Sequence, residues 1–147
     1  MNSKVRTPCI GICSTGIGDS VCRGCKRFAH EVIDWNGYSV EEQGVILDRI
    51  EMHLAQVVGI HLRVVDVALL RASLAGNSIP QGAESSPQRC AYEAIRAFGG
   101  SVSSLSAIGC EPTPEWRERP LEDMKKSLEE HFYQLSCAHY ERYFDFA

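Results

Sequence analysis

The chain has 147 residues, of which 44% are hydrophobic and 23% are charged, and these values are ordinary for one globular domain. A sizeable core can form at this length, so a bound metal need not be the only thing that holds the fold. The formal net charge is −4, and a chain with this balance has no overall basic character that would point to nucleic acid.

Four cysteines near the amino terminus follow the spacing C-x3-C-x8-C-x2-C. They are Cys9, Cys13, Cys22 and Cys25. Two cysteines this close together can bend back and present both sulphurs to one ion, and two such pairs complete a tetrahedral site. Gly11 and Gly24 lie inside the pairs and favour tight turns whose N–H groups face sulphur. The spacing predicts one metal centre, either Zn²⁺ or an iron–sulphur cluster.

Basic residues surround these cysteines. Residues 1–30 hold five lysines and arginines against one aspartate, which gives this segment a net charge of +4. Four thiolates around a divalent ion carry a charge of about −2, so one reading is that the basic residues neutralise the centre. The alternative is that Arg23, Lys26 and Arg27 bind an acidic protein or RNA.

A loop is expected after the first cysteine pair, and a short helix is expected after the second pair. Residues 14–20 are turn-forming residues and are expected to have no regular structure. Phe28–Trp35 has apolar residues at helical spacing, which predicts a helix. We expect Trp35 to cover the cysteine turns or to pack them onto the body of the protein.

A longer helix is predicted over residues 40–57. Ser39 and Glu42 form a capping box at its start, and Gly59 is expected to end it. Residues 60–65 then alternate between apolar and polar side chains, which predicts a brief extended piece. We expect little or no other strand in the chain.

Three more helices are predicted in the second half of the chain, over residues 67–75 and 87–98 and from Pro120 onward. Short turns are expected over residues 102–108 and 114–116. The last helix has the clearest apolar stripe, at steps of three and four residues. Its members are Leu121, Met124, Leu128, Phe132, Leu135 and His139.

These elements predict a mostly α fold, in which a four-cysteine knuckle packs on a bundle of about five helices. We expect one compact domain, with the knuckle and short helix in residues 1–38 and the helical body in residues 39–147. The remaining cysteines are scattered singly and are expected to be small buried apolar residues. They are Cys90, Cys110 and Cys137.

The sequence favours a binding protein over an enzyme. It contains no P-loop, no G-x-G-x-x-G, no H-E-x-x-H and no G-x-S-x-G. The leading hypothesis is a non-enzymatic, metal-binding adaptor. One alternative is a redox protein, in which an iron–sulphur cluster transfers an electron or senses oxidation. A weaker alternative is an RNA-contacting protein, for which only Phe28, Trp35 and Tyr38 lie near enough to stack on bases.

The amino terminus is polar, and no apolar segment of signal-peptide or membrane-spanning type follows it. We therefore expect a cytoplasmic protein with no membrane partner. Thiols stay reduced in the cytoplasm, which favours a metal centre over a disulfide framework for clustered cysteines.

Residues 7–43 read TPCIGICSTGIGDSVCRGCKRFAHEVIDWNGYSVEEQ. This run resembles the YdhL-like family of predicted iron–sulphur proteins, a bacterial domain of unknown function. The similarity includes the cysteine pattern, Arg27 and Trp35, and the rest of the chain is similar to the helical extension of longer members. The resemblance implies that the four clustered cysteines are ligands of an iron–sulphur cluster.

Overall fold

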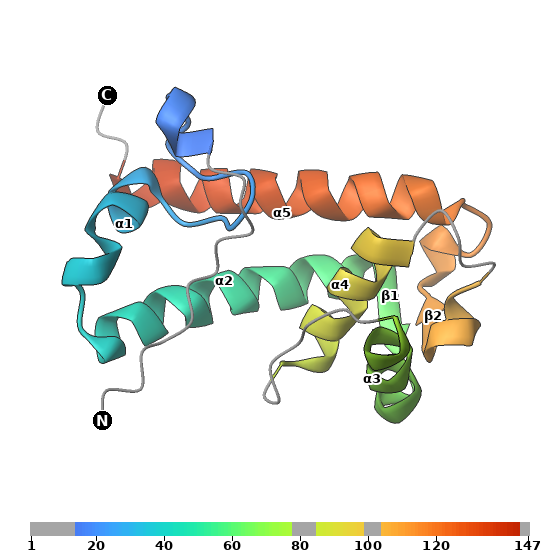
Figure 1. Ribbon diagram of the computed structural model, residues 1–147. Helices are drawn as coiled ribbons and strands as arrows, with labels where there is room; N and C mark the ends of the chain where they lie inside the picture. The colour runs from blue at the N-terminus through green and yellow to red at the C-terminus, as the bar shows by residue number, and fades with distance from the viewer. Residues whose placement is uncertain (1–13, 78–84, 99–103, 145–147) are drawn as a thin grey trace. The chain divides into compact units, whose positions relative to one another are not determined.

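The computed structural model describes residues 14–77, 85–98 and 104–144 (Figure 1). Within these ranges the fold is mostly α, as predicted. The helices are α1 (Ala29–Asp34), α2 (Val40–His61), α3 (Val67–Gly76), α4 (Pro87–Phe98) and α5 (Leu121–Phe144). Strands β1 (Leu62–Val64) and β2 (Cys110–Pro112) form one short antiparallel pair, with Arg63 opposite Glu111.

Residues 14–20 contain regular structure, contrary to the prediction for this loop. Ser14–Ile17 forms a 3-10 turn. The backbone N–H of Gly18 donates to Thr15 O at 3.2 Å, and that of Asp19 donates to Ser14 O at 3.3 Å. Gly18 has a φ of 105°, a conformation that glycine adopts readily. The turn-forming residues therefore build one compact turn.

Helix α2 begins where the capping box predicts. The Ser39 N–H donates to a Glu42 carboxylate oxygen at 3.0 Å, and the Glu42 N–H donates to Ser39 Oγ at 3.1 Å. The prediction that Gly59 ends this helix is wrong, because α2 continues to His61. Thr113 explains the extension: its hydroxyl donates to Ile60 O at 2.9 Å and its N–H to His61 O at 3.0 Å. These bonds satisfy carbonyls that a helix end leaves open.

The chain forms two compact units. The described residues of the first are 14–53 and 132–144, and those of the second lie within 54–131. Helices α2 and α5 each contribute residues to both units. These units group residues that pack together, whereas the sequence separates the cysteine knuckle and short helix from the helical body at residue 38. The division at residue 38 stays a prediction.

The core of the first unit forms around Phe28, which is fully buried. Its ring lies 5.2 Å from the Tyr140 ring and 6.0 Å from the His139 ring, both on α5. The Arg49 guanidinium of α2 lies 3.9 Å from the centre of the same ring. Phe28 therefore joins the start of α1 to both long helices in this unit.

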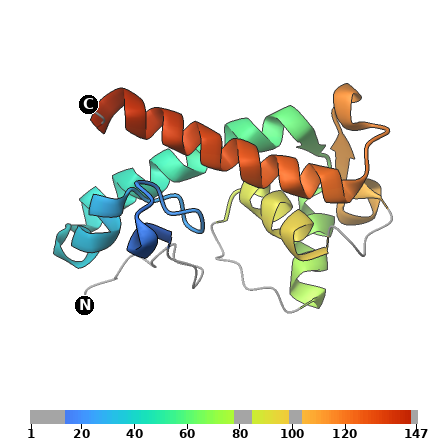
Figure 2. The same ribbon diagram turned by 90° about the horizontal axis from the view of Figure 1, so that it is seen from above.

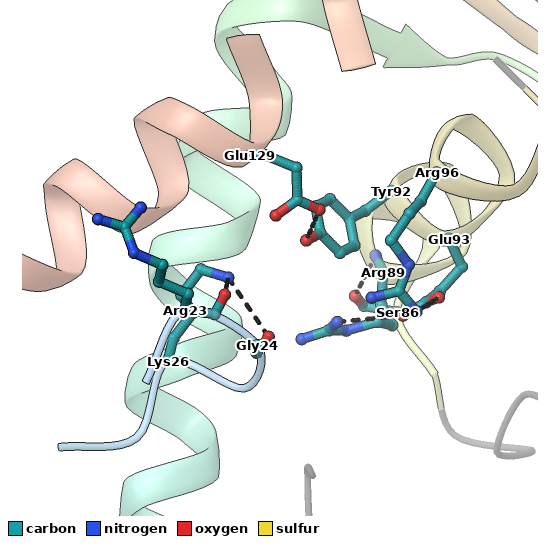
Figure 3. Close-up of polar contacts among 9 residues, drawn as sticks. All are labelled: Arg23, Gly24, Lys26, Ser86, Arg89, Tyr92, Glu93, Arg96 and Glu129. Atoms are coloured by element: carbon teal, nitrogen blue, oxygen red, sulfur yellow. Dashed lines mark hydrogen bonds and ion pairs between the residues drawn. The ribbon is translucent and has the colours of Figure 1, made fainter. Parts of the chain in front are cut away.

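In the second unit, α3 and α4 pack on one another beside the strand pair (Figure 2). The strand pair meets α3 at Gly109, whose carbonyl accepts the N–H groups of Val65 at 2.8 Å and Asp66 at 2.9 Å. From α4, the buried Tyr92 donates its hydroxyl to the Glu129 carboxylate of α5 (Figure 3). Burial and this carboxylate raise the pKa of Tyr92 well above its ordinary value.

Candidate functional site: the cysteine hairpin

Residues 21–28 form a tight hairpin that carries two of the four predicted metal ligands. Val21 and Phe28 are bridged in antiparallel fashion. The Cys22 N–H donates to Arg27 O at 2.8 Å, and the Lys26 N–H donates to Cys22 O at 2.8 Å. Lys26 has a φ of 69°, in the left-handed region that suits glycine better than lysine. The cysteine hairpin (residues 21–28) is therefore closed by a turn with one unusual backbone conformation.

The structure brings the sulphurs of Cys22 and Cys25 together. Both residues are buried, and the Cys25 thiol hydrogen-bonds the Cys22 sulphur. The Cys22 sulphur also accepts backbone N–H groups from Ser14, Gly24 and Cys25. Burial by itself raises the pKa of the Cys22 thiol, but these donors outweigh it and hold the pKa below its ordinary value. The hairpin is thus arranged to stabilise a thiolate at Cys22.

Cys25 has a different environment. Burial raises the pKa of its thiol, and Arg27 opposes this rise. The Arg27 Nε–H donates to Cys25 Sγ at 3.2 Å. The guanidinium also lies 4.8 Å from the centre of the Trp35 ring. A buried cation therefore contacts the second sulphur, and Trp35 covers that cation, in line with its predicted place beside the cysteine turns.

Cys9 and Cys13 lie outside the described residues. Ser14, which follows Cys13 directly in the sequence, is described and contacts the cysteine hairpin. Its hydroxyl accepts the Arg23 N–H at 2.8 Å, and its own N–H reaches the Cys22 sulphur. The chain that leaves the first cysteine pair is therefore fixed against the second pair. Among the described residues, no group of three or more histidines, cysteines or acids is placed to hold a metal ion.

The three basic residues predicted to bind a partner have different environments. Arg23 is exposed, lies 3.4 Å from the Asp19 carboxylate, and stacks 4.2 Å over the Tyr133 ring. Lys26 is only 1% exposed and Arg27 only 5%. Their charged groups contact the hairpin and the rings of buried aromatic residues, which leaves Arg23 as the one member of this set on the surface.

A buried ion pair between α1 and α2 contacts the end of the cysteine hairpin. Arg49 of α2 binds Glu31 of α1 through both terminal guanidinium nitrogens, Nη1 and Nη2, at 2.6 and 2.7 Å. Glu31 also accepts the Phe28 N–H at 2.8 Å, at the end of the hairpin. Phe28 and Trp35 are both buried, so neither ring is available for the base stacking that the RNA hypothesis considered.

Sequence reasoning missed Ser14, Glu31 and Arg49. Glu31 lies at the third helical position after Phe28, which is the spacing of a carboxylate that reaches back to a helix start. That signal was present in the sequence. No sequence pattern pairs Glu31 with Arg49, because the two residues are 18 positions apart and lie on different helices.

Residues 7–53 match a family described as a protein of unknown function (DUF1289). The match spans the four clustered cysteines, α1 and the part of α2 that belongs to the first unit. No curated protein and no solved structure matches the chain. None of the described helices combines the length and the apolar character needed to cross a membrane.

Proposed function

We propose that Cys9, Cys13, Cys22 and Cys25 together hold one metal centre, Zn²⁺ or an iron–sulphur cluster, and that the protein is a non-enzymatic adaptor. The observation that supports this most is the set of N–H donors around the Cys22 sulphur. Sulphur in a metal-bound cysteine is a thiolate, and a thiolate needs such donors when it is buried.

Cys110 provides the contrast within the same chain. It is as buried as Cys22, but its sulphur is the donor, to Ile108 O at 3.9 Å. Burial raises the pKa of Cys110 to about 11, so this side chain stays a neutral thiol. The difference supports a ligand role for Cys22 and a packing role for Cys110.

The surroundings of the cysteine hairpin support the proposed adaptor role. Four thiolates close a tetrahedral site and leave no open position for a substrate. The exposed Arg23 then presents a positive charge next to the centre, where an acidic segment of a protein partner would bind. Arg27 and Lys26 contribute to the centre rather than to this surface.

Metal analysis of the full chain, purified without oxygen, tests the proposal. We expect one zinc ion, or one iron–sulphur cluster with acid-labile sulphide, per chain. Cys22→Ser and Cys25→Ser should each lose most of the bound metal, whereas Cys137→Ser, a half-buried cysteine outside the motif, should keep it. A wild-type protein without bound metal would rule out the proposal, and so would full metal content in Cys22→Ser.

A second candidate function is electron transfer or redox sensing by an iron–sulphur cluster on the same cysteines. The Arg27 hydrogen bond to Cys25 Sγ favours it, because hydrogen bonds to sulphur are one of the ways in which proteins set cluster potentials. The resemblance to predicted YdhL-like iron–sulphur proteins supports the same choice. A brown protein with a reversible reduction step would establish it, and a colourless protein with one zinc ion per chain would exclude it.

A further inference from the structure

The side chain of Lys26 folds back over its own turn. Its ammonium donates to the carbonyl of Arg23 and, at 3.3 Å, to that of Gly24 (Figure 3). The ammonium also lies 4.7 Å from the centre of the Phe132 ring. A buried ammonium is unfavourable unless hydrogen bonds and aromatic faces replace water, and Lys26 has both kinds of contact.

These two carbonyls belong to particular peptide groups. The carbonyl of Arg23 shares a peptide group with the N–H of Gly24, and the carbonyl of Gly24 shares one with the N–H of Cys25. None of the described peptide bonds is cis, so each N–H points away from its own carbonyl. The N–H groups of Gly24 and Cys25 are two of the three that hydrogen-bond the Cys22 sulphur, and Ser14 supplies the third.

We propose that Lys26 is a positioning residue for the metal centre: its ammonium fixes and polarises the two peptide groups whose N–H groups bind the Cys22 thiolate. The inference rests on the proposed function, because it assigns the lysine to that centre. Hydrogen bonds arranged in a chain polarise one another, so a positive charge on the carbonyl side strengthens each N–H as a donor. The positive charge of Lys26 thus acts on the sulphur without contacting it.

The backbone conformation of Lys26 supports the same assignment. Glycine fits a φ of 69° with less strain than any residue that has a Cβ, yet this position holds a lysine. A merely structural turn would gain from glycine. The presence of a long cationic side chain that returns to the turn indicates that the ammonium has a role which glycine cannot supply.

Cobalt(II) binding to the full chain tests the inference, with metal-free, reduced protein as the starting material. Lys26→Met keeps a flexible side chain and the same backbone penalty but removes the ammonium, whereas Lys26→Gly removes the ammonium and relieves the backbone. Lys126→Met, on the exposed face of α5, is the matched control. Mutation of a residue that orients a metal ligand typically lowers metal affinity by about 10- to 100-fold. We expect both Lys26 variants to lose cobalt affinity by a factor of this size.

Two spectroscopic readouts separate positioning from simple stability. The thiolate-to-cobalt charge-transfer band should move to longer wavelength in both Lys26 variants, because a less stabilised sulphur is easier to oxidise. The amide proton signals of Gly24 and Cys25 should move upfield in the metal-free Lys26 variants, because their hydrogen bonds to the Cys22 sulphur weaken. Lys126→Met should leave all of these quantities unchanged.

The outcomes are distinguishable. If Lys26→Gly binds cobalt as tightly as the wild type with an unchanged charge-transfer band, the turn alone matters and the inference is wrong. Unmoved Gly24 and Cys25 amide signals in Lys26→Met would also overturn it. If the wild-type chain itself does not bind cobalt through thiolates, the proposed function fails, while the amide signals of the metal-free variants still decide the role of Lys26.

Discussion

Cys22 in the first unit and Cys110 in the second are equally buried, each only 1% exposed, yet their environments differ in kind. Backbone N–H groups face the Cys22 sulphur, whereas the Cys110 sulphur faces a carbonyl. Burial by itself raises the pKa of both thiols. At Cys22 the hydrogen bonds outweigh burial and lower the pKa, whereas at Cys110 the pKa stays raised. The comparison teaches that the direction of nearby peptide groups, more than burial, separates a candidate ligand from a packing residue.

Metal removal should give the largest difference between the two regions. Binding of a structural zinc ion contributes about 10–16 kcal/mol in finger peptides, which is comparable to the whole stability of an ordinary domain. We expect a chelator to lower amide-exchange protection in residues 7–35, where the hairpin's own hydrogen bonds then remain, while the helices of the second unit keep theirs. Hydrogen exchange followed by mass spectrometry measures both regions in one sample. Cooperative melting of the whole chain would contradict this expectation.

Gly109→Ala should break the strand end that holds Cys110. Gly109 has a φ of 78°, and a Cβ there would lie 2.3 Å from the Asp66 carbonyl oxygen. The left-handed conformation costs about 1–2 kcal/mol and overpacking about 1–3 kcal/mol, so we expect a loss of about 2–5 kcal/mol in a urea titration.

Gly44→Ala is the matched control, because a Cβ at this position in α2 meets nothing within 4 Å. It should stabilise the protein by about 0.5–1 kcal/mol, since alanine favours a helix interior over glycine. Equal effects of the two substitutions would contradict the close contact between residue 109 and the Asp66 carbonyl.

Arg49→Met should weaken the first unit by breaking the ion pair behind the cysteine hairpin. The Arg49 and Glu31 side chains are only 14% and 6% exposed, and loss of one partner of a buried pair costs about 3–5 kcal/mol. Arg63→Met in the second unit is the comparison. Its pair with Glu111 is 72% and 47% exposed, and such pairs contribute about 0–1 kcal/mol. Urea titrations of both variants should differ accordingly, and equal losses would refute the assignment.

The smallest expected effect is the pH dependence that His61 gives to the second unit. Burial lowers the pKa of His61, aided by His131 and Arg119 and opposed by the Val57 carbonyl and Glu115. The unfolded histidine then binds a proton at a higher pH than the folded one does. This contribution to stability is therefore complete above pH 6.5 and falls as the pH drops below it.

The slope from one histidine is at most about 1.4 kcal/mol per pH unit. Urea titrations of the wild type and of His61→Gln between pH 5 and pH 7.5 measure it, and we expect the variant to depend less steeply on pH. Ser127, whose hydroxyl lies 2.7 Å from His61 Nε2, offers a second probe of the same contact through Ser127→Ala. Identical slopes for the wild type and His61→Gln would exclude His61 as the source.

The sequence predicts much of the helical architecture because the helix signals are local. The Ser39 and Glu42 capping box binds backbone N–H groups as expected. Asp66 and Ser86 likewise accept the N–H groups of Leu69 and Arg89 at the starts of α3 and α4. The apolar stripe of α5 is buried at Met124 and Leu128. Each signal operates within four residues of its partner, so neighbouring positions in the sequence are enough to find it.

The features that the sequence does not predict depend on distant residues. Strand β2 has no alternating pattern of its own and exists because β1 pairs with it. Helix α2 passes Gly59 because Thr113 binds its last carbonyls from more than 50 positions away. At the candidate site, the spacing identifies the cysteines, but the burial of Lys26 and Arg27 depends on how the turn folds back on itself.

Ser14 has a consequence for how a metal centre would assemble. By accepting the Arg23 N–H and donating to the Cys22 sulphur, it ties the chain just after Cys13 to the cysteine hairpin. The entropy of closing the segment between the two cysteine pairs is then lost during folding rather than when the metal arrives. An incoming ion would then bind where the chain after Cys13 is already held against the cysteine hairpin. Metal binding would therefore be fast, and metal dissociation would require the hairpin to open.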